Sequence, residues 1–253
     1  KNNWNSILLR GSKDAQYNYQ VNSDDLLNIQ YTSGTTGFPK GCMQSQKFWI
    51  MTGCIAALRN KGIKSVLADA PFFYFDDHYM VIMGLYSGMT VHVSEGMSVS
   101  RFLDWIDNHQ IELAYFPTPL LETLPSPRDS ATSLKKFIGF ALNAEMTRLV
   151  EERFNVLTRD SFGMTEVGVG LLVPDTVNSD AALDSCGLPA PFRDVKIVDD
   201  NGNEVESGSP GELWIKGPGI INGYYKKPKA NKETFIDGWF RTGDIFIADK
   251  LGF

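Results

Sequence analysis

Cysteine is scarce in this 253-residue sequence, which contains only Cys42, Cys54 and Cys186. These residues form no CxxC pair and no even set, so the sequence predicts neither a disulfide framework nor a zinc site. Such a pattern favours a reducing, cytoplasmic location. The three histidines are scattered and form no HExxH-type motif, so a structural role is favoured over metal binding for each of them.

Long apolar runs and an excess of basic residues are also missing. No run reaches the roughly 18 apolar residues that a membrane-spanning helix needs, and the first residues do not have the plan of a signal peptide. With 24 Lys and Arg against 30 Asp and Glu, the formal net charge is −6. This charge gives no general reason to expect nucleic acid or an anionic membrane as a partner, so an anionic ligand needs a local site.

The sequence has no initiator methionine, and it ends at Phe253 just after what reads as a strand and a turn. We therefore expect a piece of a longer protein. Hydrophobic residues make up 43% of it. A chain of this length and composition can form one large domain or two small ones with a proper core.

Strand-like and helix-like patterns alternate along the first part of the chain. Short apolar runs predict strands at 26–32, 64–70, 90–94, 111–119 and 135–142. Helical spacing predicts helices at 45–62, 78–88 and 98–110, with Asn143 as the cap of a further helix. The run 26–32 reads as a buried strand that leads into a loop and then a helix. Such alternation predicts an α/β sheet.

The pattern becomes rich in strands after about Cys186. Two strand-like runs are separated by a segment whose Asn201-Gly202 pair is a strong hairpin-turn signal. We therefore place a boundary between Asp184 and Pro191. It separates an α/β unit, residues 1–185, from a smaller β-rich unit, residues 186–253.

The loop after the first predicted strand is rich in glycine and hydroxyl groups. It reads "SGTTGFPK" from Ser33 to Lys40. Backbone N–H groups of such a loop can converge on a phosphate, and a lysine adds positive charge. The Walker spacing GxxxxGK[ST] is not present, because Lys40 does not follow the second glycine directly. For an arbitrary loop of this composition, a solvated surface turn would be the better interpretation.

The loop belongs to the first of three motifs that favour a specific function over a surface turn. They are "YTSGTTGFPKG" at 31–41, "DSFGMTEVG" at 160–168 and "GWFRTGDI" at 238–245, in this order. Together they resemble the adenylate-forming superfamily, which includes acyl-CoA synthetases, aryl-CoA ligases, luciferases and the adenylation domains of peptide synthetases. The segment 211–228 also resembles this family. The resemblance covers nearly the whole chain and implies a partial large domain, an α/β subdomain followed by a small, barrel-like β-rich one.

The resemblance also implies a reaction. The family couples a carboxylic acid to ATP, forms an acyl-adenylate and pyrophosphate, and then passes the acyl group to a thiol. It implies ATP, Mg²⁺ and coenzyme A, with a carrier-protein thiol as the alternative acceptor. A nucleotide-binding module without catalysis is a third possibility, but the intact Thr165, Glu166 and Asp244 argue against it.

By the same resemblance, the loop binds the β and γ phosphates through Thr32, Ser33, Gly34, Thr35, Thr36 and Gly37. Lys40 acts as a mobile countercharge, unless it is simply solvated. Thr165 binds the α-phosphate, and Glu166 binds the magnesium ion. One carboxylate suffices for this ion, since Mg²⁺ usually takes one or two beside substrate phosphates.

The nucleoside contacts come from the other two strings. The resemblance implies that Phe162 stacks on adenine, unless it is core, and that Asp160 and Ser161 contact the nucleotide. Asp244 accepts hydrogen bonds from both ribose hydroxyls, a role that suits a carboxylate. The segment 139–142 departs from the small, glycine-rich pattern of relatives because Phe140 and Leu142 are bulky, which leaves adenine contacts from this segment open.

The acyl pocket is expected near 71–80, where the resemblance points to Tyr74 or Phe75 as lining residues. Relatives that activate amino acids carry a pocket aspartate, a role open to Asp76 or Asp77. Alternatively, both acids cap the following helix. Relatives also have a small C-terminal domain that supplies a lysine to the α-phosphate. The sequence ends before any such segment, so we expect this chain to bind better than it reacts.

Overall fold

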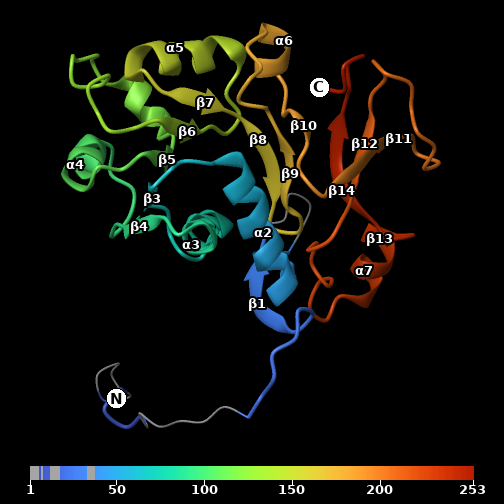
Figure 1. Cartoon of the computed structure of the whole chain (residues 1–253). Coiled ribbons are helices and arrows are strands. Elements are labelled where there is room, and N and C mark those ends of the chain that lie inside the picture. Colours follow the sequence, from blue (N-terminus) through green and yellow to red (C-terminus); the bar gives the residue numbers. More distant parts are fainter. Residues whose placement is uncertain (1–5, 7, 12–17, 33–37) are drawn as a thin grey trace.

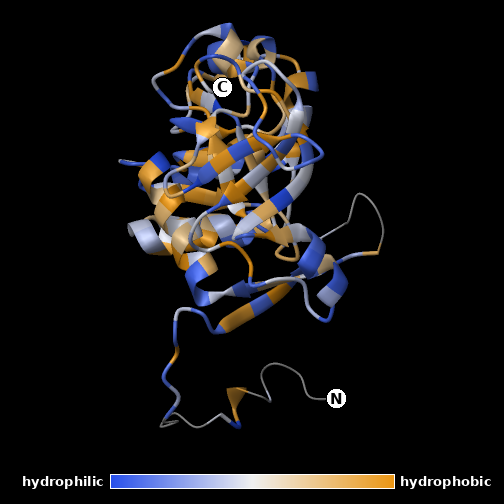
Figure 2. Cartoon of the chain, turned by 90° about the vertical axis from the view of Figure 1, so that its right-hand side faces the viewer, coloured by the Kyte–Doolittle hydropathy of each residue, from blue (hydrophilic) through white to orange (hydrophobic). Residues whose placement is uncertain are grey.

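The computed structural model describes residue 6 and residues 8–11, 18–32 and 38–253 (Figure 1). The part of the predicted phosphate loop from 33 to 37 therefore lies outside the described residues. Within the described ranges, no helix is long and apolar enough to cross a membrane. Hydrophobic residues gather in the inner strands and helices, whereas the connecting loops are largely hydrophilic (Figure 2).

A five-stranded parallel sheet forms the centre of the first part of the chain, which confirms the predicted α/β class. Its strand order is β4-β3-β5-β6-β7. The strands are β3 (Ser65–Ala68), β4 (Thr90–Val93), β5 (Leu113–Tyr115), β6 (Lys136–Ile138) and β7 (Leu157–Arg159). Strands β3 and β6 are buried throughout, as expected for a parallel sheet with both faces covered.

Helices cover both faces of this sheet. They are α2 (Gln46–Arg59), α3 (Phe75–Ser87), α4 (Val99–His109) and α5 (Ala144–Phe154). Successive strand residues point to opposite faces, so Val66 packs in the core beside α2 and α3, and Leu67 packs beside α4 and α5. Asn143 caps α5 as predicted, since its side chain accepts a hydrogen bond from the Met146 N–H.

The segment before the glycine-rich loop is a strand, but its predicted burial and connection are wrong. Strand β1 (Leu26–Tyr31) pairs antiparallel with β2 (Gly41–Ser45), so the loop joins two strands instead of a strand and a helix. Leu26 and Tyr31 are 48% and 63% exposed. An apolar run shows that a segment is extended, but not which sheet it joins, and β1 lies outside the parallel sheet.

Strand β2 is hydrogen-bonded on its other edge as well. The Met43 N–H donates to the Gly223 carbonyl over 2.9 Å, and the Tyr225 N–H donates to the Gly41 carbonyl over 2.8 Å. A bridge therefore pairs Cys42 with Tyr224, far away in the sequence. The stretch 222–225 runs beside β2 as a further extended segment.

Two antiparallel sheets complete the described fold. One has the order β10-β9-β8, from β8 (Ser161–Met164), β9 (Gly168–Leu172) and β10 (Leu188–Pro189). The other has the order β11-β12-β14-β13, from β11 (Asp194–Val198), β12 (Gly211–Lys216), β13 (Phe235–Ile236) and β14 (Trp239–Phe246). Short helices lie at η1 (Thr118–Glu122), α6 (Asp180–Leu183) and α7 (Pro228–Thr234).

The chain is richer in strands after Cys186, as predicted. The hairpin signal is confirmed, because Gly202 has a φ of +83° and its N–H closes a turn on the Asp199 carbonyl over 2.9 Å. Strand β10 pairs back onto β9, and the four-stranded sheet begins at Asp194. The division into 1–185 and 186–253 stays a prediction.

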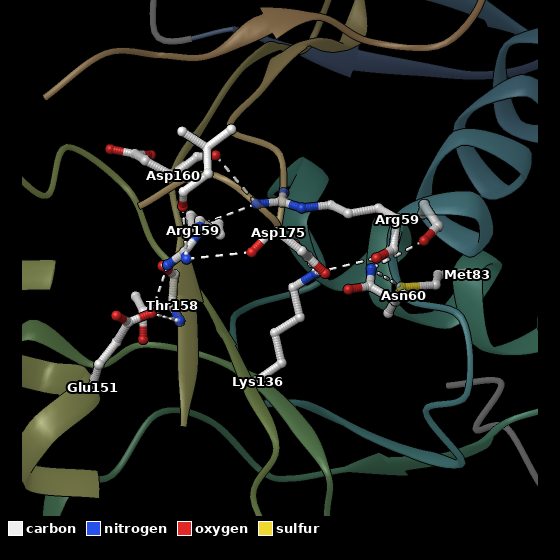
Figure 3. Close-up of polar contacts among 11 residues, drawn as sticks. Arg59, Asn60, Met83, Lys136, Glu151, Thr158, Arg159, Asp160 and Asp175 are labelled. Carbon is white, nitrogen blue, oxygen red and sulfur yellow. Dashed lines mark hydrogen bonds and ion pairs between the residues drawn. The ribbon is translucent and has the colours of Figure 1, made fainter. Parts of the chain in front are cut away.

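A part-buried polar network joins α2 to the strands of the parallel sheet (Figure 3). The Lys136 ammonium at the start of β6 lies 2.7 Å from the Asp175 carboxylate and donates to the Arg59 carbonyl over 3.1 Å. The Arg59 guanidinium donates in turn to the carbonyls of Arg159 and Asp160, over 2.8 and 3.2 Å. Burial lowers the pKa of Lys136 to about 8. The Lys136 ammonium therefore loses its proton more readily than an exposed lysine does, although it is still mostly charged at about pH 7.

Replacing Asp175 with alanine should destabilise the protein in a pH-dependent way. At about pH 7 the Lys136 ammonium is left without its partner, at a cost of roughly 1 to 3 kcal/mol. The folded pKa of about 8 lies below the ordinary value for lysine, so above it the amine is neutral in the fold and the loss of Asp175 costs less. Urea unfolding at about pH 7 and about pH 9.5 measures the difference.

The control is Asp180→Ala, which removes an ion pair with Arg148 whose side chains are 73% and 45% exposed. Exposed pairs contribute little, so this variant should be nearly neutral at both pH values. An Asp175→Ala effect that is as small as the control, or that does not change with pH, would contradict the assigned role of Lys136.

Candidate active site

Two neighbouring cavities lie among the three motifs. One has a volume of about 460 Å³ and the other of about 230 Å³, and four residues line both of them: Tyr74, Phe75, Met164 and Thr165. The larger cavity is also lined by Thr32, Lys40, Glu166, Tyr224 and Asp244. The structure thus brings residues from the start, middle and end of the chain around one space.

The ends of the glycine-rich loop are held together by the hairpin. The Thr32 N–H donates to the Lys40 carbonyl over 3.0 Å, which continues the pairing of β1 with β2. Both residues line the larger cavity. Of the predicted phosphate-binding residues, Ser33, Gly34, Thr35, Thr36 and Gly37 lie outside the described residues. The loop therefore begins and ends at the cavity wall.

Thr165 and Glu166 lie in the turn between β8 and β9. The turn is closed by a hydrogen bond from the Val167 N–H to the Met164 carbonyl over 3.1 Å, and Gly168 follows with a φ of +70°. The buried Gln44 amide of β2 donates to the Thr165 carbonyl over 2.9 Å. The turn is thus tied directly to the strand that follows the loop.

Glu166 is 5% exposed and lies beside Tyr224. The Tyr224 hydroxyl donates to the Glu166 Oε1 atom over 2.9 Å, and the Lys40 ammonium lies 4.3 Å from the centre of the tyrosine ring. Burial and the negative charge of Glu166 raise the pKa of the Cys42 thiol, which stays protonated.

Sequence reasoning missed Tyr224. The segment 211–228 resembled the family, but nothing in it indicated a contact with Glu166.

Asp244 lies on β14 and lines the larger cavity. The Glu212 carboxylate holds the backbone next to it, because it pairs with Arg241 at 2.7 Å and accepts from the Gly243 N–H at 3.1 Å. The Thr242 hydroxyl donates to the Leu213 carbonyl over 2.8 Å. Burial and the charge of Glu212 raise the pKa of Asp244. Arg241 therefore has a structural contact beside the site.

Asp160 is placed differently from its neighbours. It is 8% exposed, lines neither cavity, and uses both carboxylate oxygens on backbone groups. Its Oδ2 accepts from the Leu142 N–H over 2.9 Å, and its Oδ1 accepts from the Ser161 N–H over 2.6 Å. Ser161 and Phe162 line the smaller cavity. Phe162 also packs edge-on against Phe246 at a ring distance of 5.1 Å, so it is part of the core as well.

The bulky residues of the segment 139–142 have separate positions. Phe140 lines the smaller cavity and stacks on Tyr115 with 5.1 Å between the ring centres. Leu142 is buried in the core beside α5. Ala141 between them has a φ of +53°. The departure from the glycine-rich pattern thus places an aromatic wall in the smaller cavity.

The start of α3 supplies the remaining predicted residues. Tyr74 occupies the N-cap position and Phe75 is the first helical residue, stacked on Trp49 with 5.4 Å between ring centres. Asp76 lines the smaller cavity. Asp77 is buried and its Oδ1 accepts from the Ala70 N–H over 2.9 Å, outside the helix. Capping by these two acids is therefore wrong, because both lie inside the first turn and Tyr74 takes the cap position.

A parallel α/β sheet that is followed by antiparallel sheets, with a cavity between them, matches the large domain of adenylate-forming proteins. The chain belongs to the family of AMP-binding enzymes, whose model matches residues 3–225.

Several known proteins are similar to it. It is 32% identical over 240 residues to the 2-succinylbenzoate–CoA ligase of Bacillus licheniformis, covering 92% of this chain and 49% of the relative. It is 29% identical over 255 residues to the feruloyl-CoA synthase of an Amycolatopsis species, covering 97% and 52%.

A solved structure agrees with this assignment. The O-succinylbenzoate coenzyme A synthetase of Bacillus subtilis, in complex with ATP and magnesium ion, superposes with a TM-score of 0.86 at 26% identity. The match covers 98% of this chain and 53% of that one. The chain thus spans about half the length of the curated relatives it matches.

The buried carboxyl of Asp77, next to Asp76 at the start of α3, leads to a prediction about the stability of the protein. Burial raises the pKa of Asp77, and that of neighbouring Asp69, to about 6. The folded pKa of Asp77 lies above its ordinary value, so stability falls as the pH rises toward 6 and the carboxylate ionises. Asp77→Asn keeps an oxygen for the Ala70 N–H and removes the charge. It should raise the free energy of unfolding by about 1 to 2 kcal/mol at about pH 7.5.

The gain should shrink to a few tenths of a kcal/mol at about pH 4, where the folded carboxyl is protonated and the unfolded one is only about half ionised. Urea unfolding at the two pH values measures it, with Glu95→Gln on the surface as a control that changes stability at neither. A variant that is less stable at neutral pH would show that the Asp77 charge is favourable.

Proposed function

We propose that this chain binds Mg²⁺ and ATP and belongs to an ATP-dependent acid:CoA ligase. Such an enzyme activates a carboxylic acid as an acyl-adenylate with release of pyrophosphate, and then forms an acyl thioester with coenzyme A. The observation that carries the proposal is the placement of Thr32, Lys40, Thr165, Glu166 and Asp244 around one cavity. The relatives named as CoA ligases support the acceptor, and the cysteine pattern supports a cytoplasmic location.

The larger cavity suits a polyphosphate. Thr32 and Lys40 lie at its wall on either side of residues 33–37, and these loop residues would contact the β and γ phosphates. Thr165 lies where the two cavities meet and would hold the α-phosphate between ATP and the acid. Positively charged Lys40 and hydroxyl donors offset the charge that spreads over the phosphate oxygens during transfer.

The residues present fit a magnesium ion. Among the described residues, no group of three His, Cys, Asp or Glu side chains gathers as a closed metal site. Mg²⁺ in nucleotide sites needs only one or two carboxylates beside the phosphates, and Glu166 lies on the cavity wall with acceptor capacity beyond its bond to Tyr224. Glu166 would hold the ion, which supplies charge neutralisation at the phosphates.

The nucleoside would lie between β8 and β14. Asp244 is exposed on the cavity wall, and a carboxylate there can accept hydrogen bonds from two ribose hydroxyls. Ser161 and Phe162 would contact the adenine from the smaller cavity. Asp160 would act indirectly, without touching the nucleotide, because its carboxylate fixes the backbone of Ser161 and Leu142.

The smaller cavity would receive the acid. Tyr74, Phe75 and Asp76 line it, and so do two further tyrosines, Tyr79 and Tyr115. Aromatic walls with a few polar groups are typical of small-molecule sites. Asp76 also supports an alternative function, an adenylation domain that loads an amino acid onto a carrier protein, because a carboxylate in this cavity can pair with an ammonium group.

The wall shared by the two cavities would place the acid beside the α-phosphate of ATP, so that the two can react. A carboxylate oxygen of the acid attacks the α-phosphorus, the bond to the bridging oxygen breaks, and pyrophosphate leaves with that electron pair. A thiol sulfur then attacks the acyl carbon, and AMP leaves. Thr165 lies at the junction, so it would hold the reacting groups in line, which supplies much of the rate enhancement in such a transfer.

Titration of the chain with ATP and Mg²⁺ tests the nucleotide assignment. Asp244→Ala should weaken binding at least tenfold, because a hydrogen bond to a charged acceptor contributes roughly 1.5 to 3 kcal/mol. Binding of 2′-deoxy-ATP to the unchanged chain should show part of the same loss. Asp200→Ala, in an exposed turn, is the control. If Asp244→Ala binds ATP as tightly as this control, the ribose assignment is wrong.

Acid-dependent exchange of pyrophosphate into ATP, screened with fatty, aryl and amino acids, identifies the substrate class. If the acid is an amino acid, Asp76→Asn should reduce exchange with it roughly tenfold or more, since the ammonium loses its charged partner. Exchange with a neutral acid should change little. An equal loss with amino and neutral acids would show that Asp76 has a structural role only.

A further inference from the structure

Tyr224 is fixed in place by its backbone on both sides. The Gly223 carbonyl and the Tyr225 N–H hydrogen-bond to β2, and the Tyr224 N–H donates to the Asn231 side chain over 2.7 Å. The side chain is 2% exposed and packs against Phe48, Trp49 and Ile221. The position of its hydroxyl is therefore set by three elements that meet at this point.

The side chain lies between two charged groups of the larger cavity. Its hydroxyl donates to Glu166 over 2.9 Å, and Lys40 lies over its ring at 4.3 Å from the centre. A phenol carries its proton at physiological pH, so the Tyr224 hydroxyl is the donor in this bond. The bond is buried, which makes it stronger than the same bond in water.

We propose that Tyr224 is a positioning residue that orients the Glu166 carboxylate toward the magnesium ion that accompanies ATP. This inference rests on the proposed function. A carboxylate has about four acceptor sites, and one bond to a fixed hydroxyl stops its rotation while leaving the other sites available. Partners of this kind beside a metal ligand typically change metal affinity by about 10- to 100-fold.

A purely structural role is the competing explanation, because the ring also fills the core beside Trp49. Tyr224→Phe separates the two explanations, since it removes the hydroxyl and keeps the ring, its packing and its contact with Lys40. Tyr225→Phe is the matched control. Tyr225 is 42% exposed, lines neither cavity, and has its ring near Lys226.

The experiment measures ATP affinity by calorimetry across a magnesium titration and in EDTA. In Tyr224→Phe, the Mg²⁺ concentration for half-maximal tightening of ATP binding should rise by about tenfold. Affinity in EDTA should stay unchanged, and saturating Mg²⁺ should restore the affinity of the unchanged chain. Tyr225→Phe should match the unchanged chain throughout, and thermal unfolding should show that all three chains are folded.

Three results would overturn the inference. The Mg²⁺ midpoint could be the same in Tyr224→Phe and the control, which leaves the proposed function intact. The affinity could fall equally with and without Mg²⁺, which indicates a structural role. Finally, ATP binding to the unchanged chain could be independent of Mg²⁺, which would remove the metal assignment of Glu166 itself and with it the role of Tyr224.

Discussion

Strand β2 is the element on which the arrangement of the site depends, because it is hydrogen-bonded along both edges. Its pairing with β1 brings the two ends of the glycine-rich loop together, and its pairing with 222–225 places Tyr224 beside Cys42. Gln44 within it holds the Thr165 turn, and Ser45 at its end caps α2. Five residues therefore fix the relative positions of the loop, the turn and the segment beside them.

A second set of polar contacts, part-buried in the fold, supports the other side of the site. Lys136, Arg59 and Asp175 join α2 to β6, while Arg59 also holds the carbonyls of Arg159 and Asp160 where β7 ends (Figure 3). Asp160 then fixes the backbone on either side of the smaller cavity. Desolvated charges of this kind are expensive unless each is paired, so they hold the strands in one arrangement more than they add stability.

Sequence reasoning predicted the alternation of the parallel sheet, the cap at Asn143 and the change in texture near Cys186, because each depends on local pattern. It failed for β1, since an apolar run does not reveal which strand it pairs with. Five of the motif residues, Thr32, Lys40, Thr165, Glu166 and Asp244, line one cavity, whereas Asp160 faces the backbone instead of a cavity. Tyr224 could not be found, because its contact with Glu166 spans 58 positions and only the pairing of β2 creates it.

The wall shared by the two cavities has a thermodynamic consequence. Tyr74, Phe75, Met164 and Thr165 face both spaces, so a ligand in one cavity orders side chains that the ligand of the other also touches. Any free energy of coupling that arises there is reciprocal: the factor by which one ligand tightens the second equals the factor by which the second tightens the first. These four shared side chains would thus give two occupants a route for coupling that involves no movement of domains.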